Sequence, residues 1–296
     1  MGDIVRGKVI LNRLMMESLS LRTQEGVFVV HLFLRVNSRA WNGFSREAQI
    51  GALEGLENLL RHFNEGQQQQ AKLVLMGGKA DLGLMLVGPE RAALLQLERD
   101  VMVGLGEGVL ERVYSYFSMT EVSEYTTSEE EYRRELLGQG LEAGTEAFER
   151  ELAIRLERLK SYTLDRLYPR LPDWRFFCFY PMSKRRLPGA NWYELAFEER
   201  KALMKGHAAV GRKYVGRVLQ LVSGSIGLDD WEWGVTLFAH EARDVKAIVT
   251  EMRYDATSAR YAEFGSFYTG IQVPLVGHGE ISVRRVLERF LGIRQR

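Results

Sequence analysis

The segment from Tyr180 to Lys184, with His207 and Gln220 further along the chain, is the part of the sequence whose residue types most clearly suit chemistry. The segment begins with a phenol and ends with an ammonium. His207 adds an imidazole, and Gln220 adds a neutral amide on the next predicted strand. An imidazole that projects from a helix into an apolar pocket is a common axial ligand of haem iron. An iron porphyrin site is therefore one hypothesis for these residues.

His207 owes its predicted position to the apolar spacing of its helix. Leu203, His207, Val210 and Tyr214 recur at intervals of four, three and four residues. This spacing predicts that they share the buried stripe of one helix. A lone inward histidine is more often a hydrogen-bonded core residue than a metal ligand, so the spacing leaves both interpretations open.

The other members of the pattern also have structural interpretations. Tyr180 ends a strand whose alternate residues share one face, which is typical of a core tyrosine. Lys184-Arg185-Arg186 resembles an ordinary basic loop. Met182 suits either the edge of a porphyrin or simple gap filling in a core. The residues alone do not choose between these alternatives.

Other kinds of active site are poorly supported. None of the five histidines forms the i, i+4 pair of a zinc protease, and there is no Gly-x-Ser-x-Gly elbow or glycine-rich phosphate loop. His31 lies in an apolar run and is predicted to be a hydrogen-bonded core residue. His62, His240 and His278 fall at predicted element ends or in loops. A hydrolase or a nucleotide-binding enzyme is thus disfavoured.

Composition narrows the class of protein further. The 296 residues are 46% hydrophobic and carry a formal net charge of +1, so the overall charge does not favour nucleic acid as a partner. No apolar run approaches the roughly 20 residues of a membrane span. Cys178, the one cysteine, lies in an apolar run and is predicted to be a small buried hydrophobe. A cytoplasmic location is the default expectation.

Hydrophobic periodicity predicts the same element order twice. Each half reads as strand, helix, two strands, helix and strand. In the first half, Pro89 is expected to open the second helix. In the second half, Asn191 is expected to cap the first helix, with Glu194 as its reciprocal acid. The expected elements are 27–34, 46–63, 72–76, 81–87, 89–101 and 113–122, and then 174–182, 194–213, 215–223, 231–239, 241–254 and 264–273.

The repeated order predicts an α+β fold made of two ferredoxin-like βαββαβ halves. Helices cover one face of such a sheet, so the open faces of two copies are expected to stack into an α+β barrel. Residues 1–125 form the first half, 126–165 a charged helical connector, and 166–296 the second half with the porphyrin site. Two unrelated domains on a linker remain an alternative.

Several ordered stretches resemble the coproheme decarboxylases of the chlorite-dismutase-like superfamily. The resemblance is strongest between about residues 168 and 270 and weaker in the first half. The matching stretches are Tyr180-Pro-Met-Ser-Lys-Arg-Arg186, Asn191-Trp-Tyr193, Gly211-Arg-Lys-Tyr214, Gly224-Ser-Ile-Gly-Leu-Asp-Asp230, Glu232-Trp-Gly-Val-Thr-Leu-Phe-Ala239 and Glu263-Phe-Gly265.

The resemblance implies an oxidoreductase that uses hydrogen peroxide to remove carbon dioxide from two propionates of Fe-coproporphyrin III, giving haem b. The porphyrin is then substrate and redox centre together. The resemblance also implies a homopentamer, and a transient contact with another enzyme of haem synthesis stays open. A haem carrier or sensor without catalysis, and a chlorite dismutase or haem peroxidase, are the alternatives.

The resemblance also assigns roles to residues. His207 would be the metal ligand, Tyr180 the redox-active phenol and Lys184 its cationic partner. Gln220 would lie over the iron, where chlorite-degrading relatives carry an arginine, and this difference disfavours chlorite dismutation. Arg166 and Ser258 fall where relatives hold propionates. Glu124 stands where relatives often carry an asparagine.

Overall fold

The computed structural model describes residues 21–275 and 282–293, and His278 lies outside these ranges. Its centre is one antiparallel sheet with the strand order β10-β5-β11-β2-β3-β1-β4-β8-β9. Because β5 pairs with β9 as well as with β11, the sheet closes on itself as a barrel. None of the helices in the described ranges combines the length and the apolar character needed to cross a bilayer.

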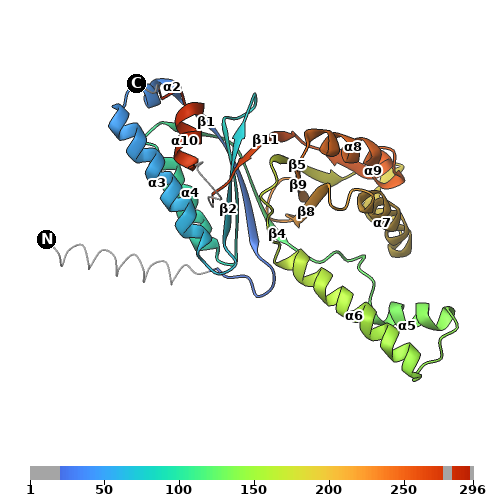
Figure 1. Cartoon of the computed structure of the whole chain (residues 1–296). Helices are drawn as coiled ribbons and strands as arrows, with labels where there is room; N and C mark the ends of the chain where they lie inside the picture. The colour runs from blue at the N-terminus through green and yellow to red at the C-terminus, as the bar shows by residue number, and fades with distance from the viewer. Residues whose placement is uncertain (1–20, 276–281, 294–296) are drawn as a thin grey trace.

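The N-terminal half supplies one side of the barrel. Its strands have the order β4-β1-β3-β2, as expected for a ferredoxin-like unit. Helices α3 and α4 cover the outer face of this sheet, with α10 beside them (Figure 1). The elements are β1 (Phe28–Val36), α2 (Ser38–Asn42), α3 (Arg46–Asn64), β2 (Gln70–Met76), β3 (Leu82–Gly88), α4 (Arg91–Gly104), β4 (Leu110–Thr120) and, near the C-terminus, α10 (Val283–Phe290).

The C-terminal half repeats this arrangement with the strand order β11-β5-β9-β8. Helices α7, α8 and α9 lie on its outer side (Figure 1). The elements are β5 (Phe176–Lys184), β6 (Arg186–Leu187), β7 (Ala190–Asn191), η1 (Trp192–Glu194), α7 (Phe197–Arg212), β8 (Val218–Gly224), β9 (Trp233–Ala239), α8 (Ala242–Met252), α9 (Ala256–Tyr261), β10 (Ala262–Phe264) and β11 (Tyr268–Val273).

Two seams join the halves. Strand β11 pairs with β2, where Ile271 lies opposite Leu75, and β4 pairs with β8, where Thr120 lies opposite Ser223. The barrel therefore has no free edge along either seam. The predicted fold class, two ferredoxin-like halves forming an α+β barrel, is confirmed.

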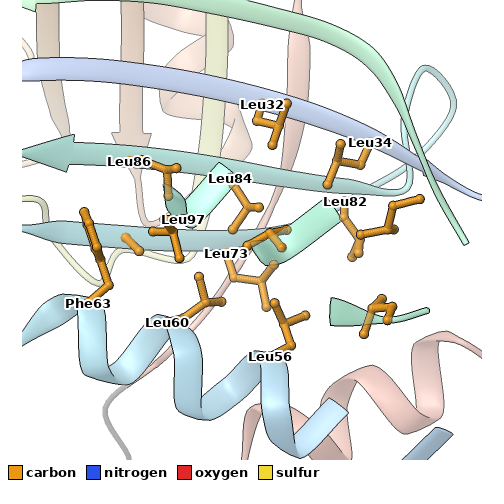
Figure 2. Packing of buried hydrophobic residues seen from close by; sticks show 14 of the residues in the cluster. Leu32, Leu34, Leu56, Leu60, Phe63, Leu73, Leu82, Leu84, Leu86 and Leu97 are labelled. Atoms are coloured by element: carbon orange, nitrogen blue, oxygen red, sulfur yellow. The ribbon is translucent and has the colours of Figure 1, made fainter. Parts of the chain in front are cut away.

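Within the described ranges, the buried side chains of the barrel and of the helices on it form three layers. An outer N-terminal layer holds Leu56, Leu60 and Phe63 of α3 against the leucines of the sheet (Figure 2). The barrel interior combines residues from both halves, such as Phe33 and Phe179. A third layer, called here the site face, lies on the outer side of the C-terminal sheet. Its buried members are Cys178, Tyr180, Tyr214, Val218, Val235, Leu237, Ala239, Val245, Ile248 and Met252.

The predicted helix starts were wrong in two places. Helix α4 begins at Arg91 after the cap residue Glu90, so Pro89 precedes the helix instead of opening it. Asn191 caps only the single turn η1, and α7 starts later, after Ala196, which offers no side-chain cap. Leu195 has the extended backbone that separates these two helical segments.

The segment before the last strand was also predicted too simply. It contains the short helix α9 and the strand β10, which pairs with the end of β5. Asp255 caps α9 by accepting from the backbone amides of Thr257 and Ser258. The helix is too short to give a recognisable apolar period, which explains why the periodicity missed it.

The connector between the halves contains two helices, α5 (Glu129–Gly138) and α6 (Glu146–Leu167). They pack on each other around Leu136, Phe148 and Leu152 and project from the barrel as a hairpin (Figure 1). Helix α6 extends to Leu167, beyond residue 165, where the connector was expected to end.

His31 links the halves inside the barrel, and the prediction of a hydrogen-bonded core histidine is confirmed. Its ring is fully buried and stacks on Phe179 at 4.0 Å, and its Nε2 lies 2.8 Å from Oγ1 of Thr236. Burial lowers the pKa of His31 from 6.5 to about 3. The folded chain therefore keeps this imidazole neutral where the unfolded chain protonates it.

This difference predicts a pH-dependent stability. As the pH falls from 6.5 towards 3, the unfolded state takes up a proton that the folded state does not, so the free energy of unfolding falls. The expected slope from this group is about 1.4 kcal/mol per pH unit. Urea unfolding of the native chain and of His31→Gln between about pH 6 and about pH 4 measures it. Equal slopes for the two proteins would contradict the account.

Candidate functional site

The site face carries most of the predicted site residues. Strand alternation puts Tyr180, Met182 and Lys184 on the same side of β5. Gln220 lies on β8 between Val218 and Val222, which both belong to the site face. The phenol and the amide are therefore on one surface, two strands apart, or roughly 10 Å.

Tyr180 is enclosed by aromatic rings from the segment around β10. Its ring stacks on Phe267 at 4.4 Å and is tilted against Phe264 at 5.7 Å. Only 4% of the residue is exposed. Burial raises the pKa of the phenol well above its ordinary value. The hydroxyl thus stays protonated at neutral pH, and removal of an electron from this ring requires the loss of its proton as well.

Lys184 ends the same strand as a buried ammonium, about 13 Å along the strand from Tyr180. Its Nζ lies 4.1 Å from the ring centroid of Trp192 and 4.0 Å from Sδ of Met204 on α7. Burial lowers the pKa of Lys184 to about 8, against the opposing charges of Asp255 and Glu232. This side chain can therefore hold an anion or exchange a proton near neutral pH.

His207 is held by a carboxylate. Its Nδ1 lies 3.0 Å from Oδ2 of Asp255, and because an ionised carboxylate only accepts, Nδ1 donates the proton in this hydrogen bond. In the neutral imidazole, Nε2 then presents a lone pair that can bind a metal. A carboxylate on the other ring nitrogen is the usual outer partner of a metal-binding histidine.

Asp255 is itself fixed in place. One carboxylate oxygen accepts from the backbone amides of Thr257 and Ser258 at the start of α9, and the other accepts from His207. Burial would raise the pKa of Asp255, but these hydrogen bonds outweigh it and hold the pKa below its ordinary value. Asp255 was not among the predicted site residues, although Asp before Ala-Thr-Ser is a capping pattern that could have located it.

The predicted burial of the His207 stripe is wrong for Leu203, His207 and Val210 and confirmed for Tyr214, which lies beyond the end of α7. No residue of α7 is buried, and Leu203, His207 and Val210 are only partly covered. The helix makes its main contacts with α8 and α9, and Val210 and Tyr214 at the C-terminal end of the stripe pack against the site face. The imidazole remains partly accessible, with 22% of its side chain exposed.

A pocket of about 460 Å³ adjoins His207. This volume lies in the usual range of small-molecule sites. The lining comes from α7 and from the start of α9, and it does not include Tyr180, Lys184 or Gln220. The lining residues are Glu199, Ala202, Leu203, Gly206, His207, Asp255 and Ala256.

The remaining predicted residues lie around this region. Arg166, at the end of α6, donates to the backbone oxygen of Val222 at 3.4 Å, and its Nε is buried without a hydrogen-bond partner. Ser258 is buried at the start of α9. Glu124 is exposed and lies 3.9 Å from Arg200, so its charge has a cationic neighbour.

The arrangement fits an iron porphyrin better than a protein-bound metal cluster. Within residues 21–275 and 282–293, no group of three or more His, Cys, Asp or Glu side chains could hold a metal ion. Haem iron needs only one protein ligand, and the carboxylate-held imidazole of His207 can supply it. The unpaired guanidinium nitrogen of Arg166 suits a carboxylate such as a propionate.

Known proteins share this fold and sequence pattern. A family model described as chlorite dismutase matches residues 49–273. A solved structure of a haem-binding protein from Thermus thermophilus is 34% identical, with a TM-score of 0.73, over 92% of this chain and 97% of that chain. A variant of the chlorite dismutase from Candidatus Nitrospira defluvii is 17% identical, with a TM-score of 0.65, over 95% of this chain and 99% of that one, a likeness of fold.

Two archaeal relatives are longer proteins. A proposed haem-binding protein of Natronomonas pharaonis is 38% identical over 84% of this chain, and one of Haloarcula marismortui is 38% identical over the same share. The chain spans only 40% and 35% of the lengths of these two proteins. Because the family model covers most of the chain and the Thermus protein aligns over nearly its whole length, the chain belongs to the chlorite dismutase-like family.

Proposed function

We propose that this protein is a hydrogen peroxide-dependent coproheme decarboxylase that converts Fe-coproporphyrin III to haem b. The observation that carries the proposal is the buried phenol of Tyr180 on the same strand face as the buried ammonium of Lys184. Across from this strand, α7 carries an imidazole held by Asp255. A carrier needs the iron ligand but has no use for a phenol and an ammonium arranged in this way.

The overall reaction balances without another reactant. Each propionic acid side chain and one hydrogen peroxide give one vinyl group, one carbon dioxide and two waters. The bound iron porphyrin supplies the redox chemistry through which peroxide accepts two electrons. Tyr180 is proposed to give up an electron and a proton and then to take a hydrogen atom from the β-carbon of a propionate.

Other side chains would place the substrate. His207 is the proposed iron ligand, with Asp255 fixing its orientation. Lys184 would bind the reacting propionate or pass a proton near Tyr180, because it is a compact charge of depressed pKa. The other proposed carboxylate contacts are Arg166 and Ser258, with Met182 at the porphyrin edge.

The alternative is a haem-binding protein without catalysis. The names of the Thermus and archaeal relatives, which describe haem binding alone, favour it. Chlorite dismutation is less well supported, because Gln220, at the position proposed to lie over the iron, is a neutral amide instead of a guanidinium. The decarboxylase and carrier proposals share the pocket and differ in what happens when peroxide is added.

Tyr180→Phe separates the two functions. The native chain with bound Fe-coproporphyrin III should lose one carbon dioxide and two hydrogens twice when hydrogen peroxide is titrated, as mass spectrometry of the extracted porphyrin measures. The variant should bind the porphyrin equally well but leave it unchanged, because it lacks the phenolic proton. Intact porphyrin in both proteins would support the carrier, and conversion by both at one rate would contradict the role of Tyr180.

Asp255→Asn tests the support of the iron ligand. Asparagine is also a good helix cap, so α9 should persist while the imidazole loses its anionic partner. Loss of such an outer partner typically weakens metal binding about 10- to 100-fold. Titration of the variant with haemin, followed in the Soret band, should show a loss of this size. An unchanged affinity would show that Asp255 does not support an iron ligand.

The pKa of Lys184 predicts how porphyrin binding depends on pH. Its ammonium attracts propionates only while protonated, and its pKa is about 8, so affinity for Fe-coproporphyrin III should fall as the pH rises through this value. Lys184→Met should bind more weakly at neutral pH and lose this dependence. Lys205→Met, at an exposed position on α7, is the matched control and should keep it. Identical pH profiles for native chain and Lys184→Met would exclude the proposed contact.

A further inference from the structure

In the structure the connector begins where β4 ends at Thr120, and it touches the predicted site through Tyr125. This residue precedes α5, and its ring packs edge-on against Trp192 with centroids 6.3 Å apart. Trp192 is buried, and its ring faces the Lys184 ammonium at 4.1 Å. Tyr261 packs edge-on against the same indole at 5.4 Å. The indole that faces Lys184 is thus held from the connector and from α9.

Tyr125 also contacts helix α7. Its hydroxyl lies 3.1 Å from Nε of Arg200, and its ring stacks on Phe197 at 5.8 Å. Arg200 and His207 are seven residues apart and so lie on the same side of the helix, two turns from each other. A connector residue therefore anchors the first turn of the helix that carries the imidazole.

Glu131 makes a second link between connector and α7. One of its carboxylate oxygens accepts from the backbone amide of Ser128 at 2.9 Å, which completes the capping box of α5. The other oxygen pairs with the ammonium of Lys201 on α7. Both partners are largely covered, with 24% and 21% of their side chains exposed, so this pair is less screened than an open surface pair. The start of α5 is thereby fixed to the start of α7.

These links matter because they hold the start of α7, whereas its middle is held by α9, where Thr257 Oγ1 donates to the backbone oxygen of Leu203 at 2.9 Å. None of its residues is buried, and its main contacts with other helices are with α8 and α9. Asp255 holds it at His207, whereas the connector holds its first turn. A change in the connector should therefore move the helix or the indole without disturbing the barrel.

We propose that Tyr125 and Glu131 are positioning residues of the porphyrin site: Tyr125 fixes Lys184 through Trp192, and Glu131 fixes the His207 helix through Lys201. This inference rests on the proposed function, because it gives the connector a role only if Lys184 and His207 bind a porphyrin. In this proposal, a displacement of the projecting α5–α6 hairpin would change the positions of Lys184 and of the helix that carries His207.

Paired substitutions of Tyr125 in the full chain test the first link. Tyr125→Phe keeps the ring against Trp192 and loses only the hydroxyl, whereas Tyr125→Leu loses both. Haemin titration should show about tenfold weaker binding for Tyr125→Leu and near-native binding for Tyr125→Phe. The pH midpoint of binding should also move upward in Tyr125→Leu, because a less enclosed Lys184 keeps its proton to higher pH.

The charged groups around Lys184 are the same in both Tyr125 variants, so a shift in the pH midpoint of binding reports the contact between Lys184 and Trp192. Asp255 and Glu232 raise its pKa, and burial, to which Trp192 and Met204 contribute, lowers it. Tyr193 and Arg186 face Glu232 and are unchanged in both variants. A loss of stability alone would lower the melting temperature without moving the midpoint.

Glu131→Gln tests the second link. Glutamine can still complete the capping box, so α5 should persist while the ion pair with Lys201 is lost. Glu131→Gln and Lys201→Met should each weaken haemin binding, and the double variant should be no weaker than either single one, which a double-mutant cycle measures.

The results separate this inference from the proposed function. A native chain that does not bind haemin contradicts the proposed function itself. Native binding combined with unchanged affinity and an unchanged pH midpoint in a folded Tyr125→Leu contradicts the Tyr125 link. Additive effects of Glu131→Gln and Lys201→Met contradict the Glu131 link.

Discussion

The barrel exists because each four-stranded sheet has two apolar faces and helices to cover only one of them. Pairing of β2 with β11 and of β4 with β8 buries both inner faces in one interior, where rings such as Phe33 and Phe179 interlock. This closure leaves the outer faces to the helices. On the N-terminal side α3 and α4 cover the sheet with leucines (Figure 2), whereas on the C-terminal side α7 has no buried residue. The same repeated unit thus yields a packed layer on both outer faces, and on the C-terminal side it adds the partly exposed helix α7 with the pocket beside His207.

Asp255 connects the elements around the pocket beside His207. Its carboxylate caps α9 and accepts from His207, and its charge opposes the lowering of the Lys184 pKa by burial. One side chain therefore orients the proposed iron ligand and influences the proposed propionate cation. The connector adds contacts from the other side through Tyr125 and Glu131. In this account, placement and electrostatics come from residues that never touch the reacting carbon atoms.

Period and alternation predicted the fold because they show which residues share one face of a helix or strand. The doubled element order predicted the two ferredoxin-like halves, and alternation placed Tyr180 and Met182 on one face, whereas Lys184 joined them only because β5 extends two residues beyond the predicted end. Periodicity cannot predict contacts between segments that are distant in the sequence. The hydrogen bond from His207 to Asp255 spans 48 positions, and the pairing of Lys201 with Glu131 spans 70. The spacing of the α7 residues predicted a buried stripe, because periodicity shows which residues share a face but does not show what covers that face. The roles of Tyr180, Lys184 and Gln220 came from family resemblance and stay proposals.

The central claim is that the outer face of the C-terminal sheet and α7 together hold an iron porphyrin whose iron is bound by His207. A crystal structure of the complex with Fe-coproporphyrin III tests it most directly. The account predicts iron bound to Nε2 of His207, with Nδ1 still on Asp255, and a propionate within hydrogen-bond distance of Lys184 on the side of Tyr180. Iron bound to another residue, or a porphyrin that contacts neither Tyr180 nor Lys184, would contradict it.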